Sequence, residues 1–162
     1  MTTRHNALAQ RIRLEINELE QTVSGVDRHW KRVKTAKEDQ DAFLNSVALN
    51  LHSFYNGLER VMELIALEMD GGALGGETWH TELLRQMTME LPAVRPAVIS
   101  AETGRNLDEY RKFRHRVRNI YAIRLNPARM EYLVENIPSI WQQVRTELGA
   151  FADFLERLEK HA

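Results

Sequence analysis

Apolar side chains recur every three or four residues along most of the chain, and this spacing constrains the fold more than any other feature. One series of this kind covers residues 8–33, and a second covers residues 44–69. Apolar residues at this spacing line one face of an α-helix, because the helix completes a turn in about 3.6 residues. Each series therefore predicts a long amphipathic helix that buries one face.

Glycine and proline indicate where the first helices end. Asp70-Gly71-Gly72 follows the second series, and glycine just after the last periodic residue commonly ends a helix. A shorter helix is expected over residues 77–91. Pro92 and Pro96 come next, so residues 92–101 should form an extended connector.

The second half of the chain predicts three further helices. The first should run from about residue 101 to about residue 122, with Ser100 as its cap. Pro127 suits the first turn of a short helix, which we expect to be interrupted near Pro138. A final helix should then run to the C-terminus.

No segment shows the sustained alternation of apolar and polar residues that is typical of strands, so no sheet is expected. The 162 residues suffice for one compact core. We therefore predict an all-α fold, an up-and-down bundle of four main helices with short additional helices, as a single domain over residues 1–162.

Composition excludes several kinds of chemistry. The chain has no cysteine, which rules out disulfides, thiolate nucleophiles and cysteine-ligated metals. Its six histidines show no metal-ligand spacing, and we expect neither a metal nor a cofactor. No apolar run approaches the roughly 18 residues of a membrane span. The first residues do not resemble a signal peptide, so a cytoplasmic location is expected.

Positive charge is concentrated on the helix predicted over residues 101–122, although the net charge of the chain is −1. On a helix, Arg111, Arg114, Arg118 and Tyr121 fall within about 80° of arc, beside the apolar face and not opposite it. The planar guanidinium group suits phosphate oxygens. These three arginines therefore predict a phosphate-binding site, with RNA as a candidate ligand.

The helix predicted over residues 44–69 carries polar residues beside its apolar face. Counted from His52, these residues come three, four and seven positions later, at Tyr55, Asn56 and Glu59. At this helical spacing their side chains lie near one another. One interpretation is that they are boundary residues satisfied by one another or by solvent. The other is that they line a site opposite the basic helix, where Glu59 and Glu63 pair with its arginines.

The basic helix also carries a family resemblance. Arg114, then four residues, then Asn119-Ile120-Tyr121 is similar to the frame of the HepT-like ribonuclease toxins, all-α proteins of the HEPN superfamily. Those toxins have arginine, four residues, histidine, one residue and tyrosine. Residues 51–60 and 113–125 share the resemblance.

The resemblance implies a metal-independent endoribonuclease acting on RNA, encoded beside a minimal nucleotidyltransferase antitoxin. Arg114 would bind the scissile phosphate, and Tyr121 would receive AMP from the antitoxin, which silences the toxin. Asn119 replaces the motif histidine and cannot transfer a proton, so His115 is a candidate substitute. Sites of this family form where two such helices meet, which implies a homodimer.

Three interpretations of function remain open. The first is an active ribonuclease toxin silenced by the nucleotidyltransferase. The second is a catalytically inactive protein of the same fold that binds nucleotide, RNA or the nucleotidyltransferase. The third is a helical bundle whose arginines only form surface salt bridges with Glu59, Glu63 and other acids.

Overall fold

The computed structural model describes residues 3–72, 74–118 and 125–161. Within these ranges there are five helices, α1 (Arg4–Thr35), α2 (Gln40–Met69), α3 (Trp79–Met87), α4 (Ala101–Arg118) and α5 (Pro127–Lys160). The described residues contain no strand beyond an isolated bridge between Leu91 and Arg95. Four long helices and one short helix confirm the predicted all-α bundle.

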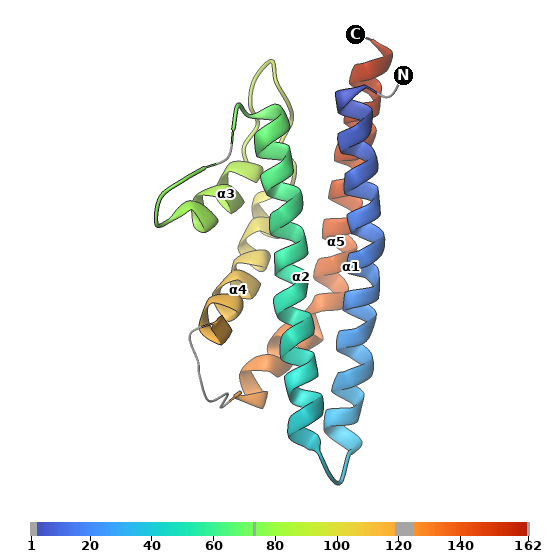
Figure 1. The fold of residues 1–162 in the computed structure, drawn as a ribbon, viewed down its shortest axis with the longest axis vertical. Helices are drawn as coiled ribbons and strands as arrows, with labels where there is room; N and C mark the ends of the chain where they lie inside the picture. Colours follow the sequence, from blue (N-terminus) through green and yellow to red (C-terminus); the bar gives the residue numbers. More distant parts are fainter. Residues whose placement is uncertain (1–2, 73, 119–124, 162) are drawn as a thin grey trace.

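Consecutive long helices run in opposite directions. Figure 1 shows α1 descending, α2 ascending, α4 descending and α5 ascending, so the start of α1 lies beside the end of α5. α1 packs against α2 and α5, whereas α3 and α4 pack against α2. α2 therefore lies between α1 on one side and α3 with α4 on the other (Figure 1). No helix in the described ranges is long and apolar enough to span a membrane.

The core consists of the apolar faces that the periodicity predicts. α1 and α2 bury residues three or four apart along their length, beginning with Leu8 and Ile12 in α1 and with Val47 and Leu51 in α2. Phe54 of α2 contacts two other helices, since its ring packs edge-to-face against Tyr110 of α4 and Trp141 of α5. The ring centres are 5.4 and 6.1 Å apart, respectively. The long helices are thus held by packing of their buried faces.

Gly57 of α2 packs tightly against side chains of α1. A Cβ atom added to Gly57 would lie 2.7 Å from Leu19 Cδ2 and 2.7 Å from Glu15 Oε1. Both partner side chains belong to α1. A side chain at residue 57 would therefore require these α1 side chains to move.

The caps of α4 and α5 agree with the sequence-based expectation. Ser100 Oγ accepts a hydrogen bond from the Thr103 backbone N–H at 3.1 Å. Pro127 lies in the first turn of α5, where Asn126 Oδ1 accepts a hydrogen bond from the Ala128 N–H at 3.0 Å. α4 is helical to Arg118, and its predicted end near residue 122 lies outside the described residues.

The predicted interruption near Pro138 is wrong, because α5 continues through this residue. Proline removes one backbone hydrogen bond and crowds the preceding turn, which bends a helix without necessarily ending it. Val134 and Ile137 before the proline and Trp141 after it are all buried. Burial on both sides favours one continuous helix, and Figure 1 shows its first part inclined to the rest.

The connector after α3 is also more compact than predicted. α3 ends at Met87, and a turn follows in which the Leu91 N–H bonds to the Arg95 carbonyl oxygen at 3.0 Å. Arg95 is buried and forms two hydrogen bonds with Asp70, from Nε at 2.6 Å and from Nη2 at 2.7 Å. Its Nη1 donates to the Met89 and Pro96 carbonyl oxygens. Arg95 therefore holds the connector against the C-terminal end of α2.

Candidate functional site

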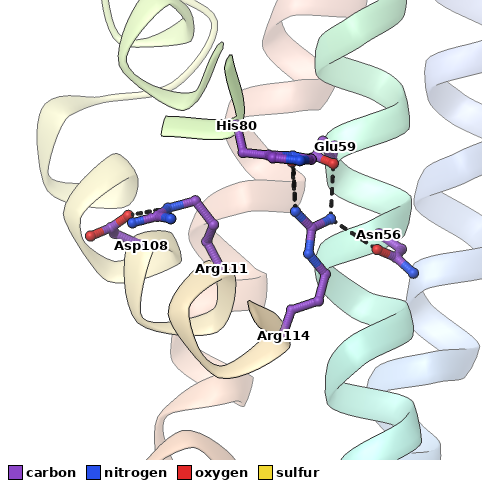
Figure 2. Close-up of polar contacts among 6 residues, drawn as sticks. All are labelled: Asn56, Glu59, His80, Asp108, Arg111 and Arg114. Carbon is purple, nitrogen blue, oxygen red and sulfur yellow. Dashed lines mark hydrogen bonds and ion pairs between the residues drawn. The ribbon is translucent and has the colours of Figure 1, made fainter. Parts of the chain in front are cut away.

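The motif arginine is buried and faces α2. Arg114 donates from Nη1 to Glu59 Oε1 and from Nη2 to Glu59 Oε2, each at 2.9 Å, and from Nη1 to Asn56 Oδ1 at 2.9 Å (Figure 2). The side chains of Arg114 and Glu59 are 4% and 7% exposed. The prediction that Glu59 pairs with an arginine of the basic helix is confirmed, although the pair is internal and not a surface salt bridge.

The helical spacing explains this burial. Arg114 follows buried Tyr110 by one turn and comes directly after buried Phe113, so it lies on the face of α4 that packs against α2. Glu59 follows buried Tyr55 by four residues on α2. Removing either charge from water alone is costly, and two parallel hydrogen bonds between opposite charges offset that cost.

A third residue, His80 of α3, joins the ion pair. Its Nδ1 lies 2.8 Å from Glu59 Oε2 and 3.2 Å from Arg114 Nη2 (Figure 2). A guanidinium group only donates, whereas a carboxylate only accepts. Because the carboxylate is the closer neighbour of Nδ1, at 2.8 Å against 3.2 Å, we assign the Nδ1 hydrogen to a bond with Glu59, which leaves Nε2 with its lone pair when the ring is neutral.

Tyr55, Asn56, Glu59, His80 and Arg114 form what we call the Arg114 cluster. The guanidinium carbon of Arg114 lies 4.7 Å from the centre of the Tyr55 ring. Burial, followed by the charge of Glu59, raises the pKa of the Tyr55 hydroxyl well above its ordinary value, while the charge of Arg114 acts in the opposite direction. Tyr55 is therefore neutral at physiological pH.

Two polar atoms of the cluster have no hydrogen-bond partner within the described protein. They are Arg114 Nε and the Tyr55 hydroxyl, both buried. Arg95, another arginine buried against a carboxylate, uses Nε, Nη1 and Nη2. Unsatisfied buried polar groups are uncommon, and Thr3 Oγ1 and Trp30 Nε1 are two further examples outside the cluster. This difference sets the Arg114 cluster apart from the structural pair of Arg95 and Asp70.

A small cavity of about 90 Å³ lies beside the cluster and is lined by Glu63, Ala66, Leu74, Trp79 and Leu83. The Trp79 ring packs on the His80 ring, with centres 3.7 Å apart, and links the cavity to the cluster. Burial, followed by the charge of Glu59, raises the pKa of Glu63. The carboxyl group of Glu63 is the acidic group in the lining of this cavity.

The other predicted site residues lie elsewhere. Arg111 Nε donates to Asp108 at 2.7 Å along α4, away from the Arg114 guanidinium (Figure 2). His115 is exposed, so its side chain and that of buried Arg114 leave α4 in different directions. Asn119, Tyr121 and the side chain of Arg118 lie outside the described residues.

Sequence reasoning did not identify His80 as a site residue. It lies 21 residues after Glu59 and 34 before Arg114, on a different helix from either. No spacing rule within one helix connects these positions. The available signal was Glu59 itself, because an acid beside a buried stripe requires a partner. Among the residues described, no group of three or more His, Asp or Glu residues could hold a metal ion.

An up-and-down bundle with a buried motif arginine on α4 has the architecture of the HEPN class. The family model described as HepT-like protein matches residues 46–155, which is more than half of the chain. The chain belongs to this family, and the resemblance seen in the sequence is confirmed. The matched segment includes the whole Arg114 cluster, whereas α1 precedes it. No curated protein and no solved structure shows a significant match.

Proposed function

We propose that the protein is the toxin of a toxin–antitoxin pair and acts as a metal-independent endoribonuclease. The carrying observation is the position of the motif arginine, which is buried and fixed in orientation by both oxygens of Glu59. Fixed charges act more strongly than mobile ones, because they need no reorganisation during the reaction. Membership of the HepT-like family supports the toxin role.

The substrate is RNA, whose 2′-hydroxyl is the nucleophile for cleavage of the adjacent phosphodiester. This reaction needs positioning, charge stabilisation and proton transfer, and it does not need a metal-bound water. The predicted phosphate-binding groups are Arg111, Arg114 and Arg118.

The antitoxin is a minimal nucleotidyltransferase that silences the toxin by transferring AMP to Tyr121. The protein acts as a homodimer in which the α4 helices of two copies lie near the two-fold axis. This arrangement would bring the two exposed His115 side chains toward the interface, while each Arg114 stays paired with Glu59 of its own chain. Light scattering at micromolar concentration should give the mass of a dimer, and a monomer would contradict the arrangement.

The activity is tested with a labelled single-stranded RNA in the presence of EDTA. Wild-type protein should produce fragments with 2′,3′-cyclic phosphate ends, and Arg114→Gln should reduce cleavage by roughly 100-fold or more. Arg95→Gln is the matched control, since it breaks the other buried arginine–carboxylate pair. Both variants are assayed at a temperature where circular dichroism shows them folded.

Intact RNA after prolonged incubation with wild-type protein would overturn the proposed activity. Equal cleavage by wild type and Arg114→Gln would remove Arg114 from the mechanism. Incubation with the nucleotidyltransferase and ATP should add one AMP to the Tyr121 peptide and stop cleavage. A mass increase elsewhere, with Tyr121 unmodified, would contradict the proposed silencing.

A second candidate is a catalytically inactive protein that binds RNA, nucleotide or the nucleotidyltransferase. Asn119 favours it, because an amide cannot replace the motif histidine in proton transfer. The occupied Nη1 and Nη2 of Arg114 favour it as well, since Asn56 and Glu59 already accept from them. Intact RNA together with a tight complex between the two proteins would select this candidate.

A further inference from the structure

We propose that His80 is the proton-transfer residue of this ribonuclease, an assignment that rests on the proposed cleavage of RNA. Asn119 lacks a group that transfers protons at neutral pH. His80 reaches Arg114 from α3, with Nδ1 3.2 Å from Nη2. The imidazole is thus beside the motif arginine in space, although it precedes the arginine by 34 residues in sequence.

Glu59 gives His80 the environment of a catalytic histidine. The carboxylate accepts from Nδ1 at 2.8 Å and is itself only 7% exposed. A buried carboxylate at one imidazole nitrogen fixes the tautomer and stabilises the imidazolium that forms when the other nitrogen takes a proton. Glu59 is therefore a positioning residue, and Arg114 holds it in place through both carboxylate oxygens.

The opposite nitrogen of His80 is available to a substrate. The side chain is 30% exposed, while Nδ1 faces the buried groups of Glu59 and Arg114. Nε2 is therefore the nitrogen that a substrate can reach. The Trp79 ring, whose plane is tilted by 32° to that of the imidazole, packs on His80 and restricts its rotation.

The charges that face His80 come from two helices. α2 contributes Glu59 and Glu63, and α4 contributes Arg114. The two carboxylates stabilise an imidazolium, whereas the guanidinium destabilises it.

In the proposed reaction the ribose 2′-oxygen attacks the adjacent phosphorus, and its proton passes to His80 Nε2. The bond from phosphorus to the 2′-oxygen forms while the bond from phosphorus to the 5′-oxygen breaks. The departing 5′-oxygen takes a proton from solvent, and the imidazolium later returns its proton to solvent. The products are a 2′,3′-cyclic phosphate and a 5′-hydroxyl, without any redox change or co-reactant.

His29 provides a structural comparison within the same chain. It is also partly buried between helices, where its Nδ1 lies 3.3 Å from the Asn50 side-chain nitrogen. This partner is a neutral amide and not a carboxylate. His29→Gln is therefore a matched control for the loss of a partly buried histidine.

The test compares RNA cleavage by wild type, His80→Gln and His29→Gln from about pH 5 to about pH 9, a range that includes the pH values at which histidine side chains commonly gain or lose a proton. We expect His80→Gln to lose roughly 100- to 10,000-fold in rate and to lose the acidic limb of the pH profile. His29→Gln should keep the wild-type rate and profile. Added imidazole should partly restore cleavage by His80→Ala, which a purely structural role would not explain.

The outcomes separate this assignment from the proposed function. Cleavage by wild type and His80→Gln at equal rates, with the same pH profile, would overturn the role of His80 and leave the ribonuclease intact. Loss of cleavage in His115→Gln with full activity in His80→Gln would assign the role to His115 instead. Failure of wild-type protein to cleave RNA at any pH would overturn both proposals.

Discussion

Glu59 and Arg114 share two parallel hydrogen bonds of 2.9 Å across the contact between α2 and α4, and both side chains are less than a tenth exposed. The pair is formed by the motif arginine and joins the two helices that carry most of the Arg114 cluster. Each charge is buried only because the other is present. The stability of the fold and the geometry of the site therefore depend on the same contact.

Arg114→Met should lower the free energy of unfolding by about 3 to 5 kcal/mol, because it leaves the Glu59 carboxylate buried without its main partner. Adding Glu59→Gln should recover part of this loss, since the remaining amide carries no charge. Urea unfolding at neutral pH measures both changes. A double variant as unstable as the sum of the two single variants would show that the pair is not coupled in this way.

Two glycine substitutions should act in opposite directions. Gly57→Ala should destabilise by about 1 to 3 kcal/mol, because the new Cβ would lie 2.7 Å from Leu19 Cδ2. Gly149→Ala should stabilise by about 0.5 to 1 kcal/mol, since it lies within α5 with no atom near the new Cβ. Thermal unfolding of both variants checks the prediction, and stabilisation by Gly57→Ala would refute the close contact.

The sequence predicts the long helices well, because burial on one face leaves a regular apolar pattern. Series such as Leu44 to Met69 then identify both the helix and its inner face. Pro138 shows the limit of this reasoning. A proline signal is local, whereas the buried residues on both sides of it stabilise α5 through contacts with other helices.

The candidate site could be predicted only in part, for a related reason. The helical arc placed Arg114 beside the apolar face, and Glu59 was a possible partner, so this half of the site follows from periodicity. His80 depends on the path of the chain between α2 and α3. Short-range patterns do not determine that path, and the structure alone brings the imidazole to Glu59.

Glu63 should make stability depend on pH. Its pKa is raised by burial and then by the charge of Glu59, so the folded state favours the protonated carboxyl group. This contribution is complete below the ordinary value of 4.5 and is lost as the pH rises through the folded-state pKa. Glu63→Gln should therefore raise the melting temperature more at about pH 7 than at about pH 4, because burying the charged carboxylate destabilises the fold only above the ordinary pKa.

Circular dichroism melts of wild type and Glu63→Gln at the two pH values test this dependence. Glu18→Gln is a suitable control, since Glu18 lies on the exposed side of α1. An effect of Glu63→Gln that is the same at both pH values would contradict the raised pKa.

The cap of α5 should contribute measurably to stability. Asn126→Ala removes the acceptor of the Ala128 N–H and should cost about 0.5 to 2 kcal/mol. Asn126→Asp keeps an oxygen acceptor and adds a negative charge at the helix N-terminus, so it should be neutral or stabilising. Chemical denaturation of both variants is the measurement, and equal losses would show that the side-chain bond is not the cause.

The tight contact at Gly57 has a consequence for the part that α1 plays in the site. Gly57 follows Asn56 and precedes Glu59 by half a turn, so α1 fixes the position of the segment that holds Arg114. α1 lies before the family-matched residues. The side chains of Leu19 and Glu15 thus pack against the turn of α2 that carries Asn56 and Glu59, so residues outside the family-matched segment border the Arg114 cluster.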